Sequence, residues 1–146
     1  MTLKNENVIF LDVDGVLNLR SDWNVIAPDI GFARLNFVLL ENFKICLART
    51  KANVVLTSTW RKDAFLLDFL KKEIPIYDVT ENFGNRGVEV ASYIQKNEVK
   101  NYAIVDDDSG YHDEHLRRFF QTDPMHGFNE TISYRVTYCL LKGEEC

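Results

Sequence analysis

Short apolar runs alternate along the chain with longer segments that carry apolar residues at helical spacing. The apolar runs predict buried strands at 8–11, 53–56 and 102–105, and weaker strands at 74–79 and 118–122. The helically spaced segments predict helices at 32–49, 61–72, 88–96 and 129–141. Pro75 inside the fourth run cannot donate a ladder hydrogen bond, so we expect that strand near a sheet edge. This alternation predicts an α/β fold, a three-layer α/β/α Rossmann-like domain with an open parallel sheet of about five strands.

Two of the predicted buried strands end in acidic residues. Asp12 and Asp14 follow the first strand, and Asp106 and Asp107 follow the strand at 102–105. Aspartate is also an ordinary turn residue, so a single pair would have a simple structural explanation. Two such strands are harder to explain as turns, and if they are parallel neighbours their carboxylates converge at one edge. Such a point is suited to a hard cation such as Mg²⁺, which prefers oxygen ligands.

Hydroxyl side chains follow the second buried strand along the chain. Thr57, Ser58 and Thr59 come directly after residues 53–56 and directly before a predicted helix. One of these hydroxyls is expected to cap that helix. Farther along, Arg86 lies where a helix begins, and a cation is unfavourable at a helix N-terminus, which invites a functional explanation for it.

Composition narrows the class of protein. The 146 residues are 46% hydrophobic and 27% charged, as in a compact domain that spans residues 1–146, and the net charge is −5. No basic tract favours tight duplex binding, and no run reaches the roughly 18 apolar residues of a membrane span. The first residues lack the apolar core of a signal peptide, and the three cysteines form neither a metal-binding pattern nor an even disulfide set. We therefore expect a cytoplasmic protein with reduced thiols, without a membrane association or an obligate protein partner.

The three strand-ending motifs, in their order, resemble the signature of the haloacid dehalogenase (HAD) superfamily. They read Phe-Leu-Asp-Val-Asp-Gly-Val-Leu-Asn, Val-Leu-Thr-Ser-Thr-Trp-Arg and Val-Asp-Asp-Asp, and they look most like the small HAD domains associated with RNA-repair proteins. The resemblance implies a Mg²⁺-dependent phosphatase. Asp12 would be the nucleophile that forms an aspartyl-phosphate, and Asp14 the general acid and base. Asp12, Asp107 and the backbone carbonyl of Asp14 would hold the metal, with Asp106 as a ligand or beside one.

The resemblance also assigns the phosphate side of the site. Thr57, ranked first, and Ser58 would hold an oxygen of the transferring phosphoryl group, and Arg86 would offset the negative charge of nucleophile and phosphate. Arg61 could grip a second phosphate of the substrate, or be solvated. Trp60 could stack on a base, but packing against the sheet is the favoured alternative.

The spacing between Asp12 and Thr57 leaves no room for a cap domain, only for the segment 18–31 beside the site. An open site is accessible to bulky substrates, so we expect a phosphorylated substrate, with a nucleotide or a nucleic-acid terminal phosphate favoured. Phosphatases of small metabolites or phosphoproteins remain alternatives, as does a catalytically silent HAD-like binding module. Many superfamily members have a hydroxyl residue two positions after the second aspartate, where this chain has Val16. This difference weakens the resemblance to the protein-phosphatase branch. A receiver domain of two-component signalling is a poor match, because Thr57 occupies the place of its phosphorylated aspartate.

Overall fold

The computed structural model describes residues 7–21 and 35–143 and contains a parallel sheet of five strands in the order β3-β2-β1-β4-β5. The strands are β1 (Asn7–Leu11), β2 (Asn53–Leu56), β3 (Asp78–Val79), β4 (Asn101–Asp106) and β5 (Phe119–Gln121). The helices are α1 (Phe37–Thr50), α2 (Ala64–Lys71), α3 (Arg86–Lys96) and α4 (Glu130–Lys142), with 3₁₀ turns η2 (Thr59–Lys62) and η3 (Asp113–Arg118). The predicted fold class is confirmed.

The central strand β1 aligns the ends of its two neighbours. Leu11, its last residue, pairs with Leu56 of β2 on one side and with Val105 of β4 on the other. All three side chains are fully buried, which is why an uninterrupted apolar run is needed there. Because the strands are parallel and their last residues are paired, the polar residues that follow each strand emerge at the same edge of the sheet.

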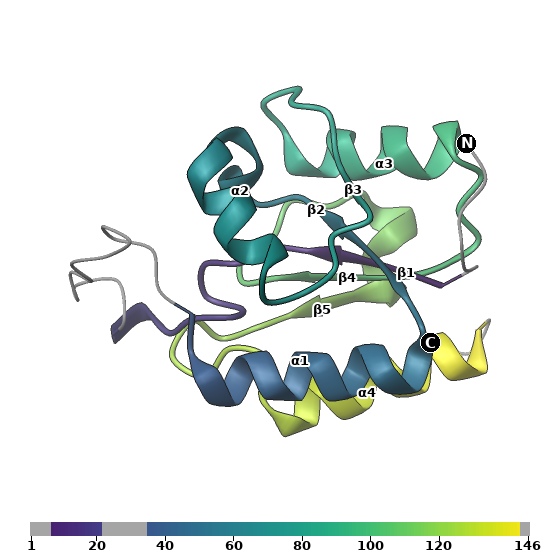
Figure 1. Cartoon of the computed structure of the whole chain (residues 1–146). Helices are drawn as coiled ribbons and strands as arrows, with labels where there is room; N and C mark the ends of the chain where they lie inside the picture. Colours follow the sequence, from purple (N-terminus) through teal and green to yellow (C-terminus); the bar gives the residue numbers. More distant parts are fainter. Residues whose placement is uncertain (1–6, 22–34, 144–146) are drawn as a thin grey trace.

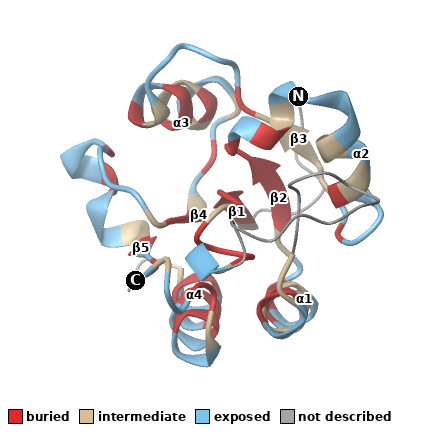
Figure 2. Cartoon of the chain, turned by 90° about the vertical axis from the view of Figure 1, so that its left-hand side faces the viewer, coloured by how far each residue is buried: buried red, intermediate tan, exposed pale blue. Residues whose placement is uncertain are grey.

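Helices cover the sheet on both faces (Figure 1). On one face α1 and α4 lie side by side, and Phe43 of α1 meets Phe128 edge-on, with the ring centroids 5.3 Å apart. On the other face α3 contributes Tyr93, which meets Phe10 of β1 edge-on at 5.6 Å. Figure 2 shows the buried strands between these two layers. The two apolar clusters hold the strand ends rigidly beneath the site.

The predicted helix at 61–72 is two elements, and this is a correction. Ser58 accepts a hydrogen bond from the Trp60 backbone N–H and caps η2, and Asp63 accepts from two backbone N–H groups and caps α2. Two caps five residues apart start two separate elements, whereas the sequence pattern indicates one. The helix predicted from residue 32 is described from Phe37, capped by Asn36; residues 32–34 lie outside the described residues.

The strand predicted at 74–79 is only Asp78–Val79, at the sheet edge as expected. The residues before it include Pro75, which has no N–H to donate. The turn η3 is a further difference, since no element was predicted over 113–117, and the strand predicted at 118–122 is only Phe119–Gln121.

The expectation of reduced thiols throughout is wrong. Cys46 is a free buried thiol, but Cys139 is disulfide-bonded, which removes the cysteine-based argument for a cytoplasmic location. None of the helices that the structure describes combines the length and apolar character that a membrane crossing requires.

Candidate active site

Asp12 lies at the carboxyl edge of the sheet and is held there by backbone contacts. Its N–H donates to the Val105 carbonyl of β4 at 3.0 Å, and the residue is only 5% exposed. The chain then turns at Gly15, whose φ of +80° is costly for any other residue. An ideal Cβ at that position would lie 2.6 Å from Cγ of Asp107 and 2.8 Å from its Cβ. Glycine is thus required where the first acidic strand approaches the second.

Three carboxylates meet at this edge. Asp12, Asp106 and Asp107 each offer an oxygen, and these oxygens all lie within 4.8 Å of one another. They line a pocket of about 320 Å³ together with Asp14 and Asp108 of the same two segments, Thr59 of η2 and Arg86 of α3. The acidic residues of the two strands are therefore brought together, whereas Asp14 contributes to the pocket wall beside them.

The close approach of these carboxylates changes their pKa values. Burial and the nearby charge of Asp106 raise the pKa of Asp12 to about 9, although Arg86 opposes the shift. Burial and contacts with Asp106 raise the pKa of Asp107 to about 6. Carboxylates so close together retain protons unless a cation replaces them. The donor set of clustered carboxylate oxygens therefore fits a hard divalent cation such as Mg²⁺.

Arg86 bridges two of these acids. Its Nη1 lies 3.0 Å from Oδ1 of Asp12 and 2.8 Å from Oδ2 of Asp106. It is the first residue of α3, where Asn85 caps the helix by accepting from the Val88 N–H. Burial alone would lower the pKa of Arg86, but the two carboxylates raise it further above its ordinary value. The acids thus compensate the unfavourable position of a cation at a helix N-terminus.

Asp106 is held by more partners than its neighbour Asp107. It accepts hydrogen bonds from Arg86, from the Tyr111 hydroxyl at 2.6 Å and from the Asp108 N–H at 2.9 Å. Burial and the charge of Asp106 raise the pKa of the Tyr111 hydroxyl. Tyr111 was not predicted, because nothing in the pattern after β4 distinguishes it from a loop residue. Asp106 is therefore oriented by the protein, and Asp107 is the more accessible carboxylate.

Asp14 accepts two side-chain hydrogen bonds, one from the end of its own motif and one from η2. Nδ2 of Asn18 donates to it at 2.9 Å, and Nε1 of Trp60 donates at 3.2 Å. Asn18 also accepts from the Gly15 N–H, so it closes the loop after β1. Trp60 is 4% exposed and belongs to the main apolar cluster, in agreement with the favoured prediction that it packs rather than stacks on a base. Asn18 was not predicted as part of the site.

The three hydroxyls after β2 have three different environments, and one of them is a cap as predicted. The fully buried Thr57 donates its hydroxyl to the Leu11 carbonyl at 3.1 Å, and Ser58 is used as the cap of η2. Neither is among the residues that line the acidic pocket, whereas Thr59 is. The preference for Thr57 over Thr59 came from its place directly after the strand. The side chain that faces the pocket is determined by the turn η2, which the pattern did not show.

Comparison with protein families identifies the family of the chain. Residues 8–132 match a family model described as the HAD domain in Swiss Army Knife RNA repair proteins. The chain belongs to this family. The matched range begins in β1 and ends in α4, so it contains every motif that forms the pocket. No curated protein and no solved structure matches the chain.

Arg61 of this HAD domain is not placed as expected. Its guanidinium pairs with Glu89 at 3.0 Å, and the side chains of both residues are 4% exposed. Its other donors contact the backbone carbonyls of Thr57, Ser58 and Thr80. A buried guanidinium with these partners is not available to a second phosphate, so the expected substrate contact is corrected to a structural contact.

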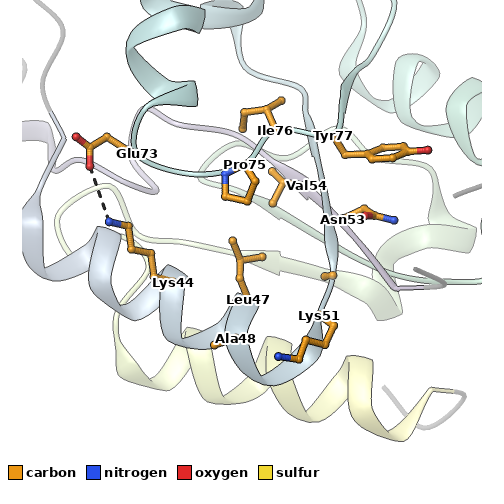
Figure 3. Close-up of a pocket in the computed structure, with 11 residues that line it drawn as sticks. Lys44, Leu47, Ala48, Lys51, Asn53, Val54, Glu73, Pro75, Ile76 and Tyr77 are labelled. Atoms are coloured by element: carbon orange, nitrogen blue, oxygen red, sulfur yellow. Dashed lines mark ion pairs between the residues drawn. The ribbon is translucent and has the colours of Figure 1, made fainter. Parts of the chain in front are cut away.

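A second pocket of the HAD domain, about 610 Å³, lies between the C-terminal half of α1, the start of β2 and the segment after α2 (Figure 3). Its wall is mainly apolar, with Leu47, Val54 and Ile76 among the lining residues, and the ion pair of Lys44 with Glu73 spans 3.8 Å at one side. None of the predicted site residues lines it. This pocket is therefore separate from the candidate chemistry at the carboxyl edge.

Proposed function

We propose that this HAD domain is a Mg²⁺-dependent phosphomonoester hydrolase that acts through an aspartyl-phosphate on Asp12. One observation carries the proposal: three carboxylates and Arg86 meet in a single pocket at the end of β1. Asp12, Asp107 and the backbone carbonyl of Asp14 would hold the metal, with Asp106 beside them. The bound Mg²⁺ would reduce the repulsion between an anionic nucleophile and an anionic phosphate.

The residues of the chain divide the reaction into two displacements. In the first, a carboxylate oxygen of Asp12 bonds to phosphorus, the bond to the ester oxygen breaks, and Asp14 donates a proton to that oxygen. In the second, Asp14 takes a proton from water, whose oxygen bonds to phosphorus and releases inorganic phosphate and free Asp12. Trp60 and Asn18 orient Asp14 for both proton transfers through their hydrogen bonds.

Arg86 and Thr59 would bind the phosphoryl group during these steps. The guanidinium lies 3.0 Å from Asp12, so a phosphoryl oxygen on Asp12 is within its reach. Its positive charge would stabilise the additional negative charge that gathers around phosphorus. Thr59 is exposed and lines the same pocket from the side of η2.

The nucleophile is tested by the change Asp12→Asn, which keeps the shape but removes the anionic oxygen. Turnover of p-nitrophenyl phosphate with Mg²⁺ should fall to background. Asp68→Asn is the matched control, because Asp68 is exposed on α2 and pairs only with Lys72 at 3.5 Å among the contacts described. Retained turnover in the Asp12 variant, with contamination excluded, would disprove the covalent mechanism. An inactive wild-type protein that still binds Mg²⁺ would favour the silent binding module.

We further propose that the substrate is a phosphorylated nucleic-acid end or a nucleotide. The family description, which refers to RNA repair proteins, supports this class. A candidate base contact is Phe83, which is 51% exposed in the loop between β3 and α3, three residues before Arg86 in the sequence. Phe83 lines a separate pocket with Glu81 and Lys96, and an exposed aromatic ring there could stack on a nucleotide beyond the terminal phosphate. The net charge of −5 would limit contact with a long polyanion to its terminal nucleotides.

This substrate class is tested by comparing kcat/KM for short oligonucleotide 3′- and 5′-phosphates with that for p-nitrophenyl phosphate. Phe83→Ala should impair the oligonucleotide and leave the small ester unchanged, because the lost contact lies outside the reacting group. Tyr138→Ala is the control, since this ring is 45% exposed on α4. A preference for sugar phosphates or phosphopeptides would exclude nucleic acid and favour the alternative phosphatases.

A further inference from the structure

A buried ion pair lies next to the phosphate side of the pocket. Nη2 of Arg61 and Oε1 of Glu89 are 3.0 Å apart, and both side chains are 4% exposed. A buried ion pair is weak evidence for stability, because removing two charges from water offsets much of their attraction. The pair therefore calls for another explanation, and its remaining hydrogen bonds supply one.

The guanidinium of Arg61 connects the ends of two strands. Nε donates to the Thr80 carbonyl just after β3 at 3.1 Å. Nη1 donates to the carbonyls of Thr57 and Ser58 just after β2, the second at 3.0 Å. These are the residues that lead into η2, where Thr59 faces the pocket. One planar group thus connects the residues that lead into η2 to the end of β3.

The carboxylate of Glu89 connects the same guanidinium to the start of α3. Its second oxygen accepts from the N–H groups of Phe83 at 2.9 Å and Gly84 at 3.2 Å, in the loop that enters the helix. Glu89 lies three residues after Arg86 on α3, so the two side chains are neighbours on one helix face. The ion pair therefore joins the turn that carries Thr59 to the helix that carries Arg86.

We propose that Arg61 and Glu89 are positioning residues that hold Thr59 and Arg86 at the separation required to bind a phosphoryl group. The inference rests on the proposed phosphatase function. Asp12 and Asp107, which would hold the metal, follow β1 and β4 and are connected by strand pairing rather than by this ion pair. Loss of the pair should therefore disturb phosphate binding and leave Mg²⁺ binding intact.

The experiment uses Glu89→Gln, which removes the charge, and Arg61→Lys, which keeps the charge but not the planar set of donors. A displacement near 1 Å at a reacting group can lower the rate about 100-fold, and we expect a loss of kcat/KM for p-nitrophenyl phosphate of about that size. Inhibition by inorganic phosphate should weaken in parallel. The Mg²⁺ concentration for half-maximal binding, measured by calorimetry, should stay at the wild-type value.

A double variant keeps the test valid if the single variants do not fold. Arg61→Met combined with Glu89→Met replaces the charges with apolar side chains of similar size, a change that often preserves stability. It still removes every hydrogen bond of the pair, so we expect the same loss of phosphate affinity. Calorimetric titration with inorganic phosphate measures the loss of phosphate affinity and does not depend on turnover. It therefore tests the ion pair even if the wild-type protein hydrolyses no ester.

The matched control is Arg118→Lys. This arginine also bonds to backbone carbonyls, those of Tyr102 at 3.0 Å and Gly143 at 2.6 Å, but beside the opposite end of β4. Wild-type kinetics are expected for it. Folded Arg61 or Glu89 variants with wild-type phosphate affinity would overturn the proposal, and so would equal losses of Mg²⁺ and phosphate binding. A wild-type protein without phosphatase activity would instead refute the proposed function.

Discussion

Substitution of Gly15 by alanine tests whether Asp107 is a metal ligand. An added Cβ would lie 2.6 Å from Cγ of Asp107, whereas ordinary contact begins near 3.4 Å, so the carboxyl group must retreat by about 0.8 Å. Rotation of the side chain alone does not relieve the overlap, because Cβ of Asp107 is also only 2.8 Å away. A Mg²⁺–oxygen bond is about 2.1 Å long and tolerates little variation, so this displacement removes the oxygen from the metal.

The expected result is Mg²⁺ binding that is weaker by about 10–100-fold in Gly15→Ala, the size of effect seen when the support of a metal ligand is disturbed. Alanine at positive φ also lowers the free energy of unfolding by about 1–2 kcal/mol. Gly84→Ala separates the two effects, because Gly84 has a similar φ of +77° and nothing within 4 Å of the added Cβ. Both variants should lose similar stability, and only Gly15→Ala should lose metal affinity.

Isothermal titration calorimetry with Mg²⁺, at a temperature where both variants are folded, measures the difference directly. The increase in melting temperature caused by Mg²⁺ gives a second reading, since a ligand that binds only the folded state stabilises it. Wild-type affinity in Gly15→Ala would refute the reasoning that Asp107 contributes to the metal site. Equal loss of affinity in Gly84→Ala would show that backbone strain, not the carboxylate, is responsible.

Three further outcomes are expected. Without Mg²⁺ the melting temperature should fall as the pH rises from about 5 to 9. The reason is that Asp12 in the folded protein, with its pKa raised to about 9, keeps a proton that the unfolded chain has lost. For this group the free energy of unfolding decreases by at most about 1.4 kcal/mol per pH unit. Saturating Mg²⁺ should flatten this slope, and a flat profile without the metal would contradict the high pKa. Trp60→Phe removes the hydrogen bond of 3.2 Å to Asp14, which is worth about 0.5–1.5 kcal/mol, and should lower kcat by up to about tenfold. An unchanged kcat would show that the bond does not assist catalysis. Asn129→Ala removes the cap of α4 and should lower the free energy of unfolding by about 1 kcal/mol, measured by thermal unfolding, with kcat unchanged. A loss of activity would mean that this helix contributes to the site.

Local pattern determined the fold class and the edge at which the acids gather. A run such as Val8–Leu11 can be satisfied only by burial on both faces, and a charged residue cannot continue such a strand, so Asp12 had to emerge at its end. The same reasoning located Asp106 and Asp107. Because parallel strands end at one edge, the meeting of the two acidic segments followed from sequence once their strands were neighbours.

The partners of the polar side chains were decided only by tertiary structure. Arg61 contacts Glu89, 28 positions away, and Asp14 contacts Trp60, 46 positions away, so no local spacing links either pair. Tyr111 is closer in sequence to Asp106, but its orientation depends on how the loop after β4 returns to the sheet. A hydrogen bond needs its atoms placed within a few tenths of an ångström, and that placement depends on the packing of several elements at once. Periodicity identifies buried faces, but it does not carry that information.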